Sequence, residues 1–303
     1  MDNKKRLRLI RALLLMIVFI CLVLMIREWH LSVSHRAKQD ELKEKLQSEH
    51  AGAEDGDKGA EKDAERKYIV GREIEAALKD VLEAVYSGSA AEVKNIWTDN
   101  RENQKEREKE PVILEKYADL YEENPDLTGW LSIEGMKIDY PVMQCEDDEY
   151  YLHHDFYGNE DKYGCLYVRE RADVDTPGTN FIIYGHNMRD GSMFGDLDLY
   201  KDEAFFEEHS VISFDTLYEE RTYEIVAVFL SRVYREDEEV FKYYDFYDAH
   251  TPEEFQDFYE NIKSMSLYDT KVTAKYGDTF ITLSTCAYHV EDGRLVVVAK
   301  RVE

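Results

Sequence analysis

Two apolar, β-branched runs near the C-terminus most constrain the fold of this chain, residues 280–285 (FITLST) and residues 294–300 (RLVVVAK). Both compositions are typical of buried strands, and the segment between them ends in the turn residue Gly293. The two runs therefore predict an antiparallel pair of strands. Cys286 then lies at the end of the first strand and Arg294 at the start of the second, so their side chains face each other across the turn.

A third apolar run, residues 180–184 (NFIIY), predicts a short strand that stops at Gly185 and leaves His186 at a strand-to-loop junction. With Cys286 and Arg294, this histidine completes a set of side chains suited to acyl transfer. A thiolate attacks a peptide carbonyl, an imidazole protonates the departing amine, and a guanidinium stabilises the oxyanion that forms between these events. Strand ends below surface loops are typical places for such a site.

Each of these three residues also has an interpretation without a catalytic role. Cys286 could be a buried structural thiol, because free cysteine is among the most buried residue types. Arg294, taken alone, is typical of a surface charge at a hairpin. Five other histidines compete with His186 for the acid role, and the last of them is expected in the exposed turn after Cys286: His153, His154, His209, His250 and His289.

The remaining cysteines indicate less. Cys21 lies in the apolar N-terminal stretch, whereas Cys145 and Cys165 border predicted strands. Exported proteins can oxidise such pairs, but spacing alone does not bring two cysteines within bonding distance, and we expect two separate thiols. No metal-ligand spacing appears, and no cofactor is expected. Acidic runs such as residues 237–239 are more typical of a solvated surface than of a calcium site.

Six segments in one order give the chain a resemblance to class B sortases. They are residues 124–131 (NPDLTGWL), 138–142 (IDYPV), 150–152 (YYL), 184–188 (YGHNM), 282–286 (TLSTC) and Arg294. The resemblance covers about residues 112–303. It implies a mainly β fold, an eight-stranded mixed barrel with N-terminal helices and a helix before the cysteine strand. It also implies a membrane-anchored cysteine transpeptidase of Gram-positive bacteria that acts on the cell wall.

The same resemblance implies roles for particular residues. Cys286 is the expected nucleophile, His186 the general acid and base, and Arg294 the group that stabilises the oxyanion. The residues expected to line the substrate groove are Tyr184, Ser284, Leu152 and Thr285. The implied partners are surface proteins with a C-terminal sorting signal, cleaved after threonine, and the amine of a cell-wall peptide or peptidoglycan precursor.

The N-terminus predicts a membrane anchor. Five basic residues within positions 4–11 precede residues 12–26, which carry no charge and are followed by Arg27. The stretch is short for a spanning helix, but arginines at its two ends can extend toward water. A cleaved signal peptide is the alternative, yet no small-residue cleavage site follows. We expect residues 1–30 to form a cytoplasmic tip and an uncleaved anchor, with the remainder outside the cell.

Residues 31–110 are predicted to form a charged extracellular stalk. Residues 31–66 contain few large apolar side chains, so they are expected to act as a tether that is partly helical. Residues 74–85 show apolar spacing typical of an amphipathic helix, which would dock on the domain or pair with another chain. A further charged linker precedes Pro111, which is well placed to begin a helix over residues 112–123 and the catalytic domain, residues 111–303.

Within that domain the pattern predicts short strands and one late helix. Thr251 is expected to cap a helix that runs to about residue 264. A first hairpin is expected from residues 130–133 and 137–143. The other predicted strands are residues 164–168, 180–184, 211–216, 222–230, 279–284 and 294–302.

Other functions stay open from the sequence. The formal net charge of −27 argues against nucleic-acid binding, because a phosphate backbone would be repelled. A hydrolytic cysteine peptidase would use the same Cys286 and His186 but release the acyl group to water. A pilin-polymerising sortase would use the same chemistry on another acceptor, whereas an inactive scaffold would lack one of the three catalytic groups.

Overall fold

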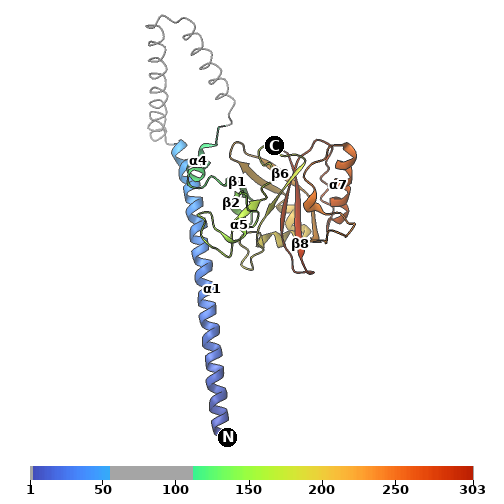
Figure 1. Cartoon of the computed structure of the whole chain (residues 1–303). Coiled ribbons are helices and arrows are strands. Elements are labelled where there is room, and N and C mark those ends of the chain that lie inside the picture. The colour runs from blue at the N-terminus through green and yellow to red at the C-terminus, as the bar shows by residue number, and fades with distance from the viewer. Residues whose placement is uncertain (1–2, 55–111, 303) are drawn as a thin grey trace, which may run out of the picture.

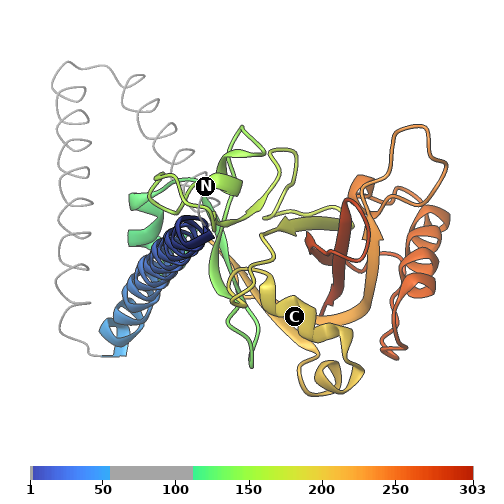
Figure 2. The ribbon, with the colours of Figure 1, turned by 90° about the horizontal axis from the view of Figure 1, so that it is seen from below.

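The computed structural model describes residues 3–54 and 112–302. The amphipathic helix predicted over residues 74–85 and the linker before Pro111 lie outside these described residues. Within them, a β-barrel is flanked by the long helix α1 on one side and by α7 on the other (Figures 1 and 2).

Eight strands close into one barrel in the order β1-β2-β3-β4-β7-β8-β6-β5. Most neighbours are antiparallel, but β2 with β3 and β4 with β7 are parallel, so the sheet is mixed. The strands are β1 (Leu127–Ser132), β2 (Asp139–Met143), β3 (Leu166–Val168), β4 (Asn180–Tyr184), β5 (Val211–Thr216), β6 (Thr222–Arg232), β7 (Phe280–Cys286) and β8 (Gly293–Arg301). The predicted eight-stranded mixed barrel is confirmed.

The interior of the barrel is filled by apolar side chains that alternate along the strands. Ile183 and Leu283 from the parallel pair meet Phe214 and Val297 in one buried cluster. Close packing of such side chains, which removes them from water, is the main stabilising contribution to a barrel of this size. The cluster includes residues of β4, which ends two residues before His186, and of β7, which ends at Cys286, so it forms a rigid base for the candidate site.

Helix α7 (Pro252–Met265) covers the outer face of the sheet. As predicted, the hydroxyl of Thr251 caps it by accepting the backbone N–H of Glu254 at 3.2 Å. Phe255, Phe258 and Ile262 form its buried face, and they pack in a second cluster that includes Phe280, Val296 and Val298. The strand that carries Cys286 is therefore supported on both faces.

Shorter helices precede the first strand or connect later ones, and the sequence patterns did not predict most of them. They are α4 (Glu115–Glu123), α5 (Tyr150–His153), α6 (Glu203–Glu208) and the 3-10 helices η1 (Gly195–Lys201) and η2 (Tyr243–Asp245). Helix α4 begins at Glu115 rather than at residue 112. Its start is delayed because the Leu114 N–H donates to the Leu217 carbonyl at 2.7 Å, which holds this residue in an extended conformation.

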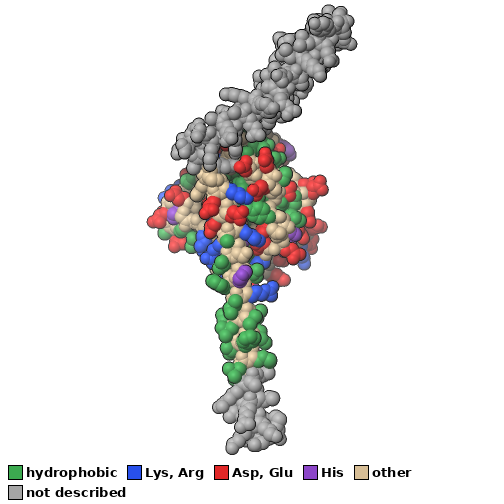
Figure 3. All heavy atoms as spheres, turned by 90° about the vertical axis from the view of Figure 1, so that its left-hand side faces the viewer, with side chains coloured by type: hydrophobic (Ala, Val, Ile, Leu, Met, Phe, Trp, Pro, Cys, Tyr) green, Lys and Arg blue, Asp and Glu red, His purple; other side chains and the backbone are tan. Residues whose placement is uncertain are grey.

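Helix α1 (Asn3–Glu54) continues without a break from the apolar segment into the charged one. Its Leu14–Ser48 part is long and apolar enough, by length and composition, to cross a membrane. Figure 3 shows hydrophobic side chains around the part that stands free of the domain. Farther along, Leu42 and His35 are buried against the domain. The prediction of a tether is therefore wrong for residues 31–46, because polar side chains of this segment pair with those of the domain.

Candidate active site

The parallel pairing of β4 with β7 brings two predicted catalytic residues to one edge of the barrel. The last paired residues are Tyr184 and Ser284, and the Gly185 N–H donates to the Ser284 carbonyl at 3.3 Å. His186 and Cys286 each follow two positions after this last pair. Because the ends of neighbouring parallel strands lie on the same side of a sheet, both residues lie at the same edge of the barrel.

The antiparallel pairing of β7 with β8 adds the third residue. Cys286 lies directly opposite Arg294, as the sequence predicted. The connecting turn closes tightly: Asp292 has a φ of 52°, and a Cβ on Gly293 would lie 2.2 Å from the Ala287 carbonyl oxygen. A larger residue than glycine would therefore open the turn and separate the two side chains. The Arg294 guanidinium donates to the Gly293 carbonyl at 2.9 Å, which folds it back onto this turn.

Two hydrogen bonds fasten the loop of His186 to the strand of Cys286. The Asn187 amide donates to the Cys286 carbonyl at 2.8 Å, and the Thr285 hydroxyl donates to the Gly185 carbonyl at 2.7 Å. The contact between Asn187 and the strand of Cys286 was not predicted from the sequence. The position of Asn187 next to His186 within the YGHNM segment was the only signal that could have indicated it.

His186 is held by a carbonyl and is partly shielded from water. Its Nε2 lies 2.8 Å from the Leu152 carbonyl oxygen. A carbonyl only accepts, so Nε2 carries a proton and the exchangeable position of the neutral ring is Nδ1. Burial is the main cause that lowers the pKa of His186, and the nearby His153, at 6.4 Å between ring centroids, lowers it further. The bond to Leu152 acts in the opposite direction.

The four predicted groove residues occupy different environments. The Ser284 hydroxyl is buried and lies 2.7 Å from the Tyr243 hydroxyl, while Thr285 is also buried. Both hydroxyls are thus engaged inside the protein. Tyr184 and Leu152 are partly exposed, and so have surface to offer a substrate. Burial raises the pKa of Tyr184, which keeps its phenol protonated.

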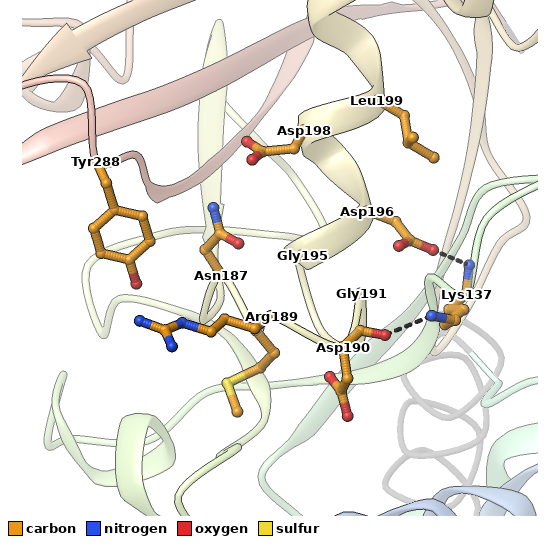
Figure 4. A pocket seen from close by; sticks show the side chains of 11 residues that line it. Lys137, Asn187, Arg189, Asp190, Gly191, Gly195, Asp196, Asp198, Leu199 and Tyr288 are labelled. Atoms are coloured by element: carbon orange, nitrogen blue, oxygen red, sulfur yellow. Dashed lines mark hydrogen bonds between the residues drawn. The ribbon is translucent and has the colours of Figure 1, made fainter.

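A depression of about 690 Å³ is lined by the loop that follows His186 and by Tyr288. Asn187 lies within it between Tyr288 and Asp198, as Figure 4 shows, and Lys137 closes the far side by donating to the Asp190 carbonyl at 2.5 Å. Cys286, His186 and Arg294 are not among its lining residues. The Asn187 amide, which donates to the Cys286 carbonyl, connects the depression to Cys286.

Cys145, Cys165 and His289 have environments different from those of Cys286 and His186. Cys145 and Cys165 are both free, which confirms two separate thiols. Burial raises the pKa of the Cys165 thiol, whereas Cys286 is only partly buried. His289 is exposed in the turn, as expected. Among residues 3–54 and 112–302, we find no group of three His, Cys, Asp or Glu side chains that could hold a metal ion.

Known proteins similar to this chain share one description. A model of the sortase domain matches residues 131–302. Sortase B of Listeria monocytogenes is 36% identical over 196 residues, which are 63% of this chain and 75% of that protein. Sortase B of Staphylococcus aureus is 29% identical over 193 residues, 63% of this chain and 76% of that protein.

Solved structures agree with these sequence matches. The crystal structure of sortase B from Bacillus anthracis in complex with AAEK1 has a TM-score of 0.56 and 34% identity, covering 68% of this chain and 99% of that chain. The structure of Staphylococcus aureus sortase B has a TM-score of 0.57 and 28% identity, covering 63% of this chain and 89% of that chain.

Proposed function

Because this chain belongs to the sortase family and is a cysteine transpeptidase of class B, we propose that Cys286, His186 and Arg294 are its catalytic residues. The proposal is supported mainly by the register of strands β4, β7 and β8 at one edge of the barrel. Cys286 is paired with Arg294 across a tight turn, and the strand of His186 runs parallel to that of Cys286 up to Tyr184 and Ser284.

In the first half-reaction, the reacting form has a Cys286 thiolate and a protonated His186, and the thiolate sulfur attacks the carbonyl carbon of a threonine residue in a C-terminal sorting motif. The C–S bond forms as the carbonyl oxygen becomes an oxyanion, which Arg294 and a backbone N–H stabilise. When the C–N bond breaks, His186 gives a proton to the leaving amine. Since the Leu152 carbonyl engages Nε2, we assign this transfer to Nδ1.

In the second half-reaction, an amine of a cell-wall peptide attacks the thioester carbon. A C–N bond forms, His186 accepts the proton of the amine, and the C–S bond breaks to return Cys286. The acyl donors are surface proteins with a C-terminal sorting signal. Tyr184 and Leu152 are the predicted groove residues that offer surface to this donor, whereas Ser284 and Thr285 would act through the backbone and through packing.

Membrane placement is part of the same proposal. Residues 1–30 anchor the chain with the N-terminus in the cytoplasm, residues 31–110 lie outside the membrane, and residues 111–303 form the catalytic domain. The basic residues before the apolar segment support this orientation by the positive-inside rule.

The test is a Cys286→Ala variant offered a library of threonine-containing peptides with and without an amine acceptor. The natural chain should give a thioacyl adduct by mass spectrometry and an amide product with the acceptor. Cys286→Ala should lose both, because it lacks the nucleophile, whereas Cys145→Ala, a matched thiol outside the site, should keep them. Residual turnover above about 1% in Cys286→Ala would refute the assignment. Release of free acid despite abundant acceptor would instead identify a hydrolytic peptidase.

A further inference from the structure

One stripe of helix α1 contacts the catalytic domain at intervals of three or four residues. Glu28 pairs with Lys162, and Ser32 donates to the Asp190 carboxylate at 3.0 Å. The stripe continues with His35 against Asp161, Lys38 with Asp155, Leu42 in an apolar cluster and Lys45 with Glu123. This spacing is that of one helix face, so a single straight element carries all of these contacts.

Buried groups fix this helix to the barrel. His35 stacks on Tyr163 with ring centroids 4.1 Å apart, and Leu42 is 1% exposed. The Lys38 ammonium lies 2.6 Å from the carboxylate of Asp155, which is itself buried. Leaving such a charge buried without its partner is costly, which favours the docked arrangement over a free helix. Residues 28–46 of α1 and the barrel are therefore one body.

The same helix continues into the apolar segment, which sets the height of the site. Ser32 is six residues beyond Ile26, and at a rise of about 1.5 Å per residue this corresponds to about 9 Å. Ile26 and Trp29 are 63% and 67% exposed, as expected for side chains in lipid and at its boundary. Asp190, the partner of Ser32, lines the depression beside the proposed catalytic residues.

The proposed active-site edge faces this boundary. In Figure 1 the lower edge of the barrel, where β8 begins, points toward the N-terminal end of α1. Asn187 lies on the same loop as Asp190 and bonds the carbonyl of Cys286. The level at which Ser32 meets Asp190 therefore approximates the level of the nucleophile above the membrane.

We propose that α1 is a spacer of fixed length that holds the active-site edge about 9 Å above the outer end of its apolar segment. The proposal rests on the catalytic assignment made above for Cys286. A polypeptide anchored in the same membrane then reaches the site only if about three extended residues separate its cleavage point from the bilayer, at about 3.4 Å per residue. If α1 held the site higher, the substrate would need a longer segment between its cleavage point and the bilayer.

The experiment uses the full chain in lipid vesicles with the catalytic domain outside. Seven helix-forming residues of Glu, Lys and Ala are inserted between Arg27 and Glu28, which raises the domain by about 10 Å and leaves every contact from Glu28 onward intact. Substrates are peptides tethered to a membrane helix by linkers of graded length, and the same peptide free in solution. A matched control carries the same seven residues ahead of Asn3, where they do not change the height.

For the natural chain and the control, we expect cleavage of tethered peptides to begin at linkers of about three residues, and for the inserted chain at about six. At the shortest productive linker the inserted chain should lose at least tenfold in rate, whereas all three chains should cleave the free peptide within twofold of one another. An unchanged linker threshold would overturn the spacer role. A natural chain that cleaves only peptides with ten or more linker residues would also overturn the spacer role, and this result can be obtained without any variant. Loss of free-peptide cleavage in the natural chain would instead count against the proposed function.

Discussion

At the scale of single residues, the main electrostatic feature of the candidate site is the pKa of His186. Burial lowers its pKa below the ordinary range, so near neutral pH the ring is mostly neutral and Nε2 donates to the Leu152 carbonyl. The proposed role of His186 as an acid needs the protonated ring. Activity that depends on this form decreases as the pH rises through the pKa of His186.

The variant His153→Gln tests the electrostatic coupling between the two rings. It removes a neighbouring imidazole whose Coulombic effect lowers the pKa of His186, so this pKa should rise, while burial keeps it below the ordinary range. The decrease of kcat/KM on the alkaline side should then move to higher pH. An NMR titration of the His186 ring and the pH profile of kcat/KM measure the two effects. The control is His154→Gln, whose ring stacks on Tyr150 instead. A downward shift, or equal shifts in both variants, would contradict the coupling.

Arg294→Lys tests the geometry required of the cation. A guanidinium presents a planar fork that can bond the turn carbonyl of Gly293 and an oxyanion together, whereas an ammonium is a point charge on a flexible stem. We expect kcat/KM to fall by about 100-fold, comparable with the loss of one oxyanion donor. Arg232→Lys, which changes an arginine paired with Glu238 on the adjacent strand, should stay near the natural rate. Equal rates for the two variants would place Arg294 outside the chemistry.

At the scale of elements, sequence patterns predicted the helices and strands that show a clear local periodicity. Every strand of the barrel and helix α7 were predicted within a few residues, because alternating apolar residues and the Thr251 cap act locally. Helix α5 was missed, since a single turn has no periodicity to detect. Its role is long-range: the Leu152 carbonyl accepts from His186, 34 positions away, and no local pattern indicates such a bond.

Helix α7 should contribute measurably to the stability of the strands that carry the site. Phe258 is 1% exposed and stacks on Phe246 with ring centroids 3.9 Å apart. Phe258→Ala leaves a cavity against β7 and should lower the free energy of unfolding by about 3–5 kcal/mol, measured by urea denaturation. Gln256→Ala, on the exposed face of the same helix, should change it by no more than about 0.5 kcal/mol. If Phe258→Ala also lowered the free energy of unfolding by no more than about 0.5 kcal/mol, the cluster would have collapsed around the gap.

At the scale of the whole molecule, the docked half of α1 could not be predicted from the sequence. Residues 31–54 contain few apolar side chains, and composition alone indicated a tether. The structure shows that one buried leucine, Leu42, and a series of polar pairs are sufficient, because the partners of α1 come from distant parts of the domain. Lys38 and Asp155, for example, are 117 positions apart. A run of charged residues in a sequence therefore suggests a solvated segment, because the distant side chains that pair with it cannot be identified from the sequence.

This docking predicts a difference between two shortened chains. A chain beginning at Pro111 should be soluble, monomeric and active on free peptides, because all proposed catalytic residues lie beyond that point. A chain beginning at Leu31 keeps the docked half of α1 and should melt at a temperature higher by about 4–8 °C, the equivalent of about 2 kcal/mol for a domain of this size. Thermal midpoints and light-scattering masses of the two chains measure the effect.

A single substitution separates the contribution of α1 from that of residues 55–110, which the longer chain also contains. Leu42→Asp places a charge in the apolar cluster around Tyr117 and Leu120, so in the longer chain it should remove most of the difference in midpoint. Glu44→Asp, a conservative change at an exposed position of α1, should leave the midpoint of the longer chain unchanged. If Leu42→Asp also leaves the midpoint unchanged, the stabilisation comes from residues 55–110. If the two chains melt together, the docked helix contributes position and not stability, and only the linker experiment can then measure what α1 contributes.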